Sequence, residues 1–214
     1  MLFDMEALAP QDTYKLLIAT VVPRPIAWVT TLDRDGVRNA APFSFFNAVS
    51  GHPPVVCIGI GGRAPGDAKD TGNNIRATGQ FVVNLVSEET AAAMNVTAIE
   101  FGSDVDELAE AGLTTVPSVK VRPPRIAESP VSMECERLVL VDVGDDRTVV
   151  LGRVLALHVR DDCVMDPAKC YIDTPKLGLV GRLHGSGWYA RLSDRFELPR
   201  IGVADWAARK RAAE

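Results

Sequence analysis

The sequence predicts a mainly β fold with peripheral helices, an α+β arrangement. A β-branched and apolar run over residues 26–32 precedes the polar turn 33–36 and a second extended run over 37–41, which is typical of an antiparallel hairpin. Two longer runs, 131–143 and 148–159, flank a four-residue polar turn. Because long twisted strands curl, these runs favour a barrel, with the helices as decorations between strands.

Length and composition narrow the class of protein. With 214 residues, 47% hydrophobic and 24% charged, the chain suits one domain, residues 1–214. A net charge of −5 argues against a nucleic-acid partner, which would require a basic face. No apolar run approaches the ~20 residues of a membrane-spanning helix, and the N-terminus lacks a basic segment before an apolar one. We therefore expect a cytoplasmic protein that neither binds nucleic acid nor enters a membrane.

The cysteines and histidines do not form a metal-binding pattern. The four cysteines show no CxxC spacing, and the three histidines are scattered along the chain. Cys57 and Cys135 lie inside apolar runs, where a reduced cysteine behaves as a small hydrophobe. The sequence predicts neither a metal site nor a disulfide framework.

The segments around the hairpin predict a helix and a buried strand. Residues 1–19 contain the apolar patch Leu16–Ile18, consistent with a short arm or helix. Residues 55–60 are almost wholly apolar, so we expect a strand with both faces covered. The glycines at 59–64 match the dinucleotide pattern GxGxxA, but Pro65 stands where a helix should open. A flexible loop explains them better than a dinucleotide site.

Three further helices and a strand are expected in the middle of the chain. Asp70 or Thr71 can cap a helix that stops near Gly79, and residues 81–86 form the next strand. A second helix opens at Ser87 and runs through Met94. The third starts at Ser103 with Asp106 in a capping-box arrangement and ends at Gly112, and the basic tail 209–211 looks frayed.

The segment after the hairpin, Pro42–Asn47, places Ser44 and Asn47 among three phenylalanine rings. One interpretation is the edge of a core strand, in which the rings pack and the polar side chains bond to their own backbone. The other is a slot for a flat polar ring system, whose edge would meet main-chain N–H groups. The residues alone leave both interpretations open.

Several separated segments together resemble the flavin reductase-like family, which includes flavoredoxins. The segments, in order, are PRPIAWVTTLDRDGVRNAAPFSFFNAVSGHPP, KDTGNNI, FVVNL, SPVSMECE, VVLGRVLALHV and GRLHGSGWYARLSDRFELPRI. The resemblance covers about residues 20–201, the expected domain core, and implies an FMN-binding split β-barrel of Greek-key type.

FMN needs a seat for its phosphate, and the start of the helix at 70–79 offers one. A helix N-terminus presents N–H groups and partial positive charge, Thr71 adds a hydroxyl and Lys69 a full charge. We predict that Lys69, Asp70, Thr71 and Asn74 bind the phosphate. The alternative is an ordinary capped helix with a solvated lysine.

The resemblance also implies residues for the rest of the cofactor. Phe43, Ser44, Phe45, Phe46 and Asn47 would run beside the isoalloxazine ring. Arg24 would reach the phosphate or the ribityl chain, or else form a surface ion pair. In the glycine-containing segment 182–189, Arg182 and Tyr189 would contact the cofactor, while His184 and Trp188 would contact substrate or nicotinamide.

By the same resemblance we expect an NADH- or NADPH-dependent flavin reductase, including the role of reductase for a partner oxygenase. The alternatives are a flavoredoxin-like electron carrier and a flavin-binding barrel without turnover. Hydride transfer from nicotinamide to flavin requires alignment but no obligatory acid or base, so we name no catalytic residue. A homodimer is expected, from the apolar strand 55–60 and from the resemblance.

Overall fold

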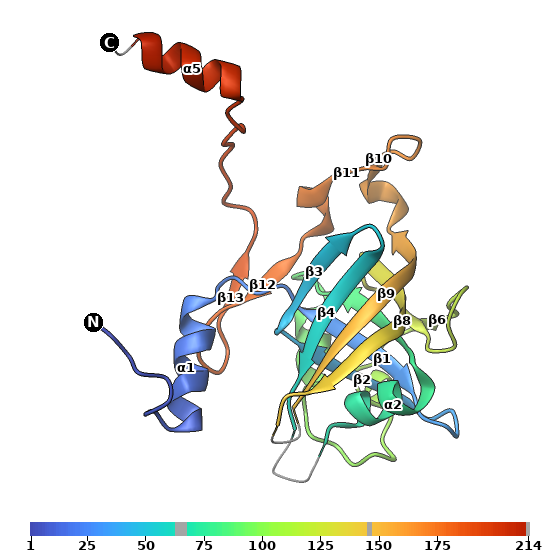
Figure 1. Cartoon of the computed structure of the whole chain (residues 1–214). Helices are drawn as coiled ribbons and strands as arrows, with labels where there is room; N and C mark the ends of the chain where they lie inside the picture. The colour runs from blue at the N-terminus through green and yellow to red at the C-terminus, as the bar shows by residue number, and fades with distance from the viewer. Residues whose placement is uncertain (63–67, 145–146, 213–214) are drawn as a thin grey trace.

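The computed structural model describes residues 1–62, 68–144 and 147–212. Seven strands form one antiparallel sheet in the order β2-β1-β5-β8-β9-β4-β3 (Figure 1). Their bounds are β1 Ala27–Leu32, β2 Arg38–Phe43, β3 Phe46–Gly51, β4 Pro54–Ile60, β5 Gln80–Leu85, β8 Val131–Asp142 and β9 Thr148–Val159. Three small ribbons pair β6 Thr115–Val116 with β7 Arg125–Ile126, β10 Val164–Asp166 with β11 Tyr171–Ile172, and β12 Val180–Arg182 with β13 Tyr189–Arg191.

The two edges of this sheet belong to strands that are consecutive in the sequence. β2 and β3 are joined by Ser44 and Phe45 alone, yet they lie at opposite ends of the strand order. Phe43 from β2 and Ile58 from β4 share one buried apolar cluster, and the N–H of Gly59 donates to the carbonyl of Phe45 over 2.7 Å. The sheet is therefore curled into a split barrel with its seam at the β2–β3 corner.

β1 is buried on both of its faces. Ala27 and Val29 point into the barrel cluster, while Trp28 belongs to a second cluster under the helices α3 Ala91–Val96 and α4 Glu107–Glu110. The indole of Trp28, which is fully buried, donates to the hydroxyl of Thr97 at 2.9 Å. Burial of such a ring contributes about 2–3 kcal/mol or more, so this strand anchors the core.

Close packing inside the barrel requires a glycine at one position of β9. A Cβ on Gly152 would lie 2.3 Å from the ring of Phe81, which is itself fully buried. The strand can cross the ring there because glycine has no side chain.

Most expected strands are confirmed. β1 and β2 pair from Ala27↔Phe43 to Leu32↔Arg38, and the turn between them has Gly36 at φ +92°. β8 and β9 pair along almost their full length, although residues 145–146 of their expected turn lie outside the described residues. The expected loop at 59–64 likewise lies partly outside them, since 63–67 are not described. The helix expected in residues 1–19 is α1, Pro10–Thr20.

The predicted helix caps were partly wrong. α2 spans Asp70–Thr78 and ends at the left-handed Gly79, but its N-cap is Lys69 and no side chain caps it. α3 begins at Ala91 instead of Ser87, because Ser87 and Thr90 bond each other in the turn that precedes it. α4 starts after Asp106, whose carboxylate accepts from the N–H groups of Leu108 and Ala109, so Ser103 is not its cap.

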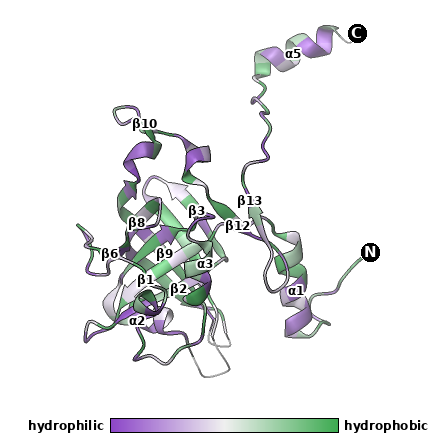
Figure 2. Ribbon diagram, turned by 180° about the vertical axis from the view of Figure 1, so that it is seen from behind, coloured by the Kyte–Doolittle hydropathy of each residue, from purple (hydrophilic) through white to green (hydrophobic). Residues whose placement is uncertain are grey.

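β3, the three small ribbons and helix α5 Val203–Ala212 were not predicted. α5 contains the tail expected to fray and carries no buried residue. It lies away from the barrel at the end of the arm formed by residues 192–202, as both views show (Figures 1 and 2). Within the described part of the chain, no helix is long and apolar enough to cross a membrane.

Candidate functional site

A groove of about 530 Å³ lies at the barrel seam, a size typical of small-molecule and cofactor sites. The β2–β3 corner, Pro42–Phe45, forms one side, and the first turns of α1 contribute Pro10, Gln11 and Tyr14. Three glycines at and after the end of β4, Gly59, Gly61 and Gly62, line another part of it, together with Lys69 and Arg147.

Phe45 forms an aromatic wall of the groove. Its side chain is 42% exposed, and its ring meets the ring of Tyr14 edge-on, with centroids 6.1 Å apart. Gly59 permits this placement, since a Cβ there would lie 3.1 Å from the Cβ of Phe45. Aromatic faces of this kind pack well against flat ring systems. Tyr14 was not identified from the sequence, because nothing in the local pattern of α1 shows that it meets Phe45.

Buried Arg24 supports the β2–β3 corner of the groove. It is 5% exposed, and its guanidinium donates to the carbonyls of Ile18, Val21 and Leu183, each at 2.8 Å. A fourth bond runs to the hydroxyl of Ser44 at 3.3 Å. Burial lowers the pKa of Arg24, but a guanidinium keeps its proton in proteins. The surface ion pair considered for Arg24 is therefore wrong, and its contacts are those of a positioning residue.

Lys69 brings a positive charge into the groove. Its Nζ lies 5.9 Å from the centre of the Phe43 ring, and Phe43 itself is buried below. Of the four residues predicted at the helix start, Lys69 is the one that lines this groove. Asp70 lines a smaller adjoining hollow of about 50 Å³ together with Asn39 and Glu107.

Thr71 and Asn74 face the sheet. Thr71 is 1% exposed and its hydroxyl lies 3.0 Å from the Asn39 amide group, while the Asn74 amide donates to the Thr31 hydroxyl at 3.0 Å. These bonds dock α2 on β1 and β2. Neither side chain lines the groove, so their predicted contact with a phosphate finds no support in this geometry.

Glu107 is a buried carboxylate that sequence reasoning missed. One of its oxygens accepts from the Ala40 N–H at 3.0 Å, and burial raises the pKa of Glu107. In the sequence it is one of several acidic residues of a short helix, without any signal that it points inward.

The predicted residues at 182–189 pair with one another at the tip of the β12–β13 ribbon. Arg182 lies 4.7 Å over the Tyr189 ring, and the rings of His184 and Trp188 stack at 6.3 Å. None of these four lines the groove, but the ribbon is tied to it because Arg24 and Arg182 exchange two backbone hydrogen bonds.

The last two residues predicted beside the isoalloxazine, Phe46 and Asn47, belong to β3. Phe46 packs on the barrel cluster, and the side-chain oxygen of Asn47 accepts from the N–H of Ala48 on exposed β3.

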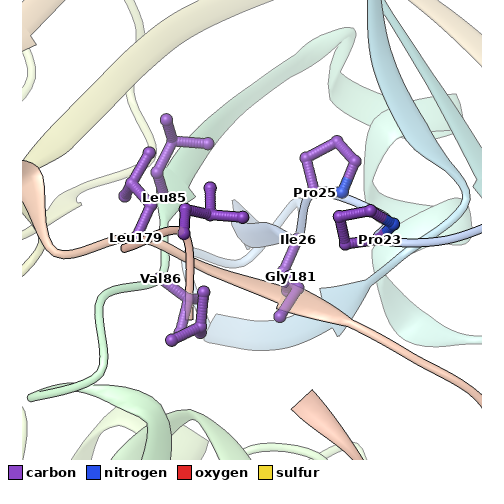
Figure 3. Close-up of a pocket in the computed structure, with 9 residues that line it drawn as sticks. Pro23, Pro25, Ile26, Leu85, Val86, Leu179 and Gly181 are labelled. Atoms are coloured by element: carbon purple, nitrogen blue, oxygen red, sulfur yellow. The ribbon is translucent and has the colours of Figure 1, made fainter. Parts of the chain in front are cut away.

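A second, apolar hollow of about 130 Å³ lies where the start of β1, the end of β5 and β12 meet. Figure 3 shows Pro23, Pro25, Ile26 and Leu85 around it. A cofactor site needs a few polar groups that fix orientation, and the walls here are almost wholly apolar. The groove at the seam is the better candidate. Among the described residues, no cluster of His, Cys, Asp and Glu is arranged to hold a metal ion.

The fold of this chain has counterparts among known proteins. A family model described as "Flavin reductase like domain" matches residues 19–173. The chain belongs to the flavin reductase-like family. An uncharacterized protein of Deinococcus radiodurans is 43% identical over 216 residues, which span 99% of this chain and 95% of that protein.

Two solved structures of this flavin reductase-like fold are similar over nearly the whole chain. The 2-nitrobenzoate 2-nitroreductase of Pseudomonas fluorescens is 33% identical with a TM-score of 0.86, covering 95% of this chain and 98% of its own. Component B of nitrilotriacetate monooxygenase from Bacillus cereus is 32% identical with a TM-score of 0.86, covering 92% and 98%. The resemblance and the split-barrel fold expected from the sequence are thereby confirmed.

Proposed function

We propose that the seam groove binds FMN and that the protein is a flavin reductase that takes hydride from NADH or NADPH. One observation carries the proposal: the groove combines an aromatic wall at Phe45, a cation at Lys69 and glycine backbone in a single hollow. These are the elements that a flat ring with a phosphate tail requires.

The chain's own residues bind and orient the cofactor. Bound flavin supplies the hydride-accepting chemistry, and the protein supplies alignment and exclusion of water. Lys69 would hold the phosphate, and Phe45 and Ser44 would hold the isoalloxazine. Arg24 keeps this corner fixed through its bonds to Ser44 and to α1. The β12–β13 ribbon, with His184 and Trp188 at its tip, is the proposed contact for the nicotinamide.

An anaerobic absorbance experiment tests the proposal. The purified protein with FMN should lose its flavin absorbance near the visible maximum within minutes of adding NADH or NADPH. Bleaching by dithionite alone would favour the flavoredoxin-like carrier. A protein that leaves FMN fluorescence unchanged throughout a titration would contradict flavin binding in any form.

The electron acceptor is proposed from the two structural relatives. Likeness to the monooxygenase component favours a partner oxygenase as the consumer of reduced flavin. Likeness to the nitroreductase favours a nitroaromatic acid as the alternative acceptor. Adding 2-nitrobenzoate to the anaerobically reduced protein separates them, because a nitroreductase would reoxidise the flavin without oxygen.

We also propose a homodimer, on grounds different from the sequence argument. Most apolar side chains of β4 are already buried within one chain, so they need no second copy. The C-terminal arm and the first residue of α5 instead expose large apolar side chains: Phe196 is 89% exposed, Leu198 83% and Val203 90%. Large apolar side chains left in water favour coverage by another surface, here a second chain.

The single domain 1–214 and the cytoplasmic location stay predictions.

A further inference from the structure

We propose that Arg147 is the second cation of the groove and binds the phosphate of the flavin nucleotide together with Lys69. This inference rests on the proposed function and adds to it a residue from a different part of the chain. The sequence alone predicts phosphate contacts at the start of α2 and from Arg24, and it gives no signal for Arg147.

Strand register brings Arg147 to the groove. β4 and β9 pair with Ile60 opposite Thr148, so the next residues outward, Gly61 and Arg147, face each other across the end of the sheet. The backbone of Arg147 is held by two bonds, from its N–H to the Gly144 carbonyl and from the Val143 N–H to its own carbonyl, each 2.9 Å. The β8–β9 hairpin therefore fixes the backbone from which the Arg147 side chain extends.

The guanidinium extends over Gly61. A Cβ built on Gly61 would lie 3.5 Å from Nη1 of Arg147, so the arginine lies directly against this glycine. Both residues line the seam groove. The glycines that resemble a dinucleotide motif thus have another role: they leave backbone and space next to a cation.

The described residues bring charge of one sign to the groove. Lys69 and Arg147 are the charged residues among the described residues that line it. Arg38, Arg76, Arg153 and Arg191 each form an ion pair with a carboxylate, whereas Arg147 pairs with none in the part of the chain that the structure describes. An anion is the ligand that this pair of cations fits.

A phosphate monoester fits the two cations best. The planar guanidinium offers two parallel N–H donors to two phosphate oxygens, and the lysine adds a point charge. Riboflavin has the same ring but no phosphate, so it should not sense either cation. The comparison of FMN with riboflavin therefore isolates the contribution of the phosphate.

Flavin titration of Arg147→Gln tests the inference, with dissociation constants read from quenching of flavin fluorescence. FMN binding should weaken roughly tenfold to a hundredfold, while riboflavin binding should stay unchanged. Arg147→Lys should retain part of the FMN affinity. The matched control is Arg122→Gln, which removes the same charge from an exposed arginine outside the groove and should change neither constant. Added salt should weaken FMN binding less in Arg147→Gln than in the parent.

The outcomes separate this inference from the proposed function. If the parent binds neither flavin, the proposed function itself fails. If the parent binds FMN and Arg147→Gln binds it equally well, or loses riboflavin to the same degree, Arg147 does not hold the phosphate. Thermal unfolding of each variant shows whether it is folded, and Arg147→Lys supplies the same comparison if the glutamine variant is not.

Discussion

The guanidinium of buried Arg24 donates a hydrogen bond to the hydroxyl of Ser44, 3.3 Å away, across 20 residues of sequence. The same group bonds the carbonyls at the end of α1 and the carbonyl of Leu183. One side chain thereby fixes three segments around the groove. The location of Arg24 predicts a role in stability and in holding the shape of the proposed flavin site.

Arg24→Ala should destabilise the protein by about 3 kcal/mol or more. The substitution leaves the buried carbonyl of Ile18 without its donor, at about 1–3 kcal/mol, removes two part-buried bonds to Val21 and Leu183, and opens a cavity. Because the Ser44 corner would loosen, FMN and riboflavin should both bind more weakly. Denaturant unfolding and flavin titration measure the two effects. An unchanged midpoint would show that the four bonds contribute nothing to stability.

Lys69→Ala should weaken FMN by roughly tenfold to a hundredfold and leave riboflavin unaffected, because charge-assisted bonds to phosphate contribute about 1.5–3 kcal/mol. The measurement is the ratio of the two dissociation constants. Lys176, which bonds the Asp162 carbonyl outside the groove, gives the control variant Lys176→Ala. Equal loss of riboflavin affinity would contradict a phosphate contact.

Thr71→Ala should behave differently from Lys69→Ala. The Thr71 hydroxyl is buried against Asn39, so its removal should cost about 1–3 kcal/mol of stability. FMN affinity should change by less than about threefold, since the side chain does not line the groove. A large loss of FMN affinity, without a loss of riboflavin affinity, in a fully folded variant would show that Thr71 does contact the phosphate.

Glu107→Gln should stabilise the protein more at pH 7 than at pH 4. Burial raises the pKa of Glu107 above the usual value of a glutamate, so the folded state favours the protonated carboxyl. The stability that Glu107 provides is therefore present below the unfolded pKa and is lost as the pH rises through the folded one. Gln mimics the neutral form and can still accept from Ala40. Thermal unfolding of both proteins across this pH range gives the comparison, and a difference independent of pH would refute it.

Removal of residues 193–214 should convert the proposed dimer to a monomer while the barrel stays folded. The arm and α5 contain none of the buried core residues, so their loss should leave β-sheet circular dichroism and the main unfolding transition in place. Light scattering on a sizing column measures the mass, which is 23.1 kDa for one full chain. Phe196→Asp in the full chain is the milder test. A truncated chain that stays dimeric would place the interface elsewhere.

The sequence by itself determined the local elements. Alternation, β-branching and polar turns specified the β1–β2 and β8–β9 hairpins, and glycine at 79 specified the end of α2, because these features depend on neighbours along the chain. The sequence also showed that Lys69 stands directly at the start of α2. The caps of α3 and α4 could not be read from the sequence. The Ser87 hydroxyl accepts from the N–H of Thr90 in the turn before α3, and Asp106, not Ser103, accepts from the first turn of α4.

Only the tertiary structure decided which side chains reach the groove. Thr71 and Asn74 face the sheet because they form hydrogen bonds there with Asn39 and Thr31. Arg24 is buried among carbonyl groups that accept its hydrogen bonds, one of them 159 residues away in the sequence. Arg147 enters the groove because the β4–β9 register places it opposite Gly61. Such contacts join segments that are remote in sequence, and the closing of the sheet sets them. The pattern within any one segment does not encode which partner will lie beside it.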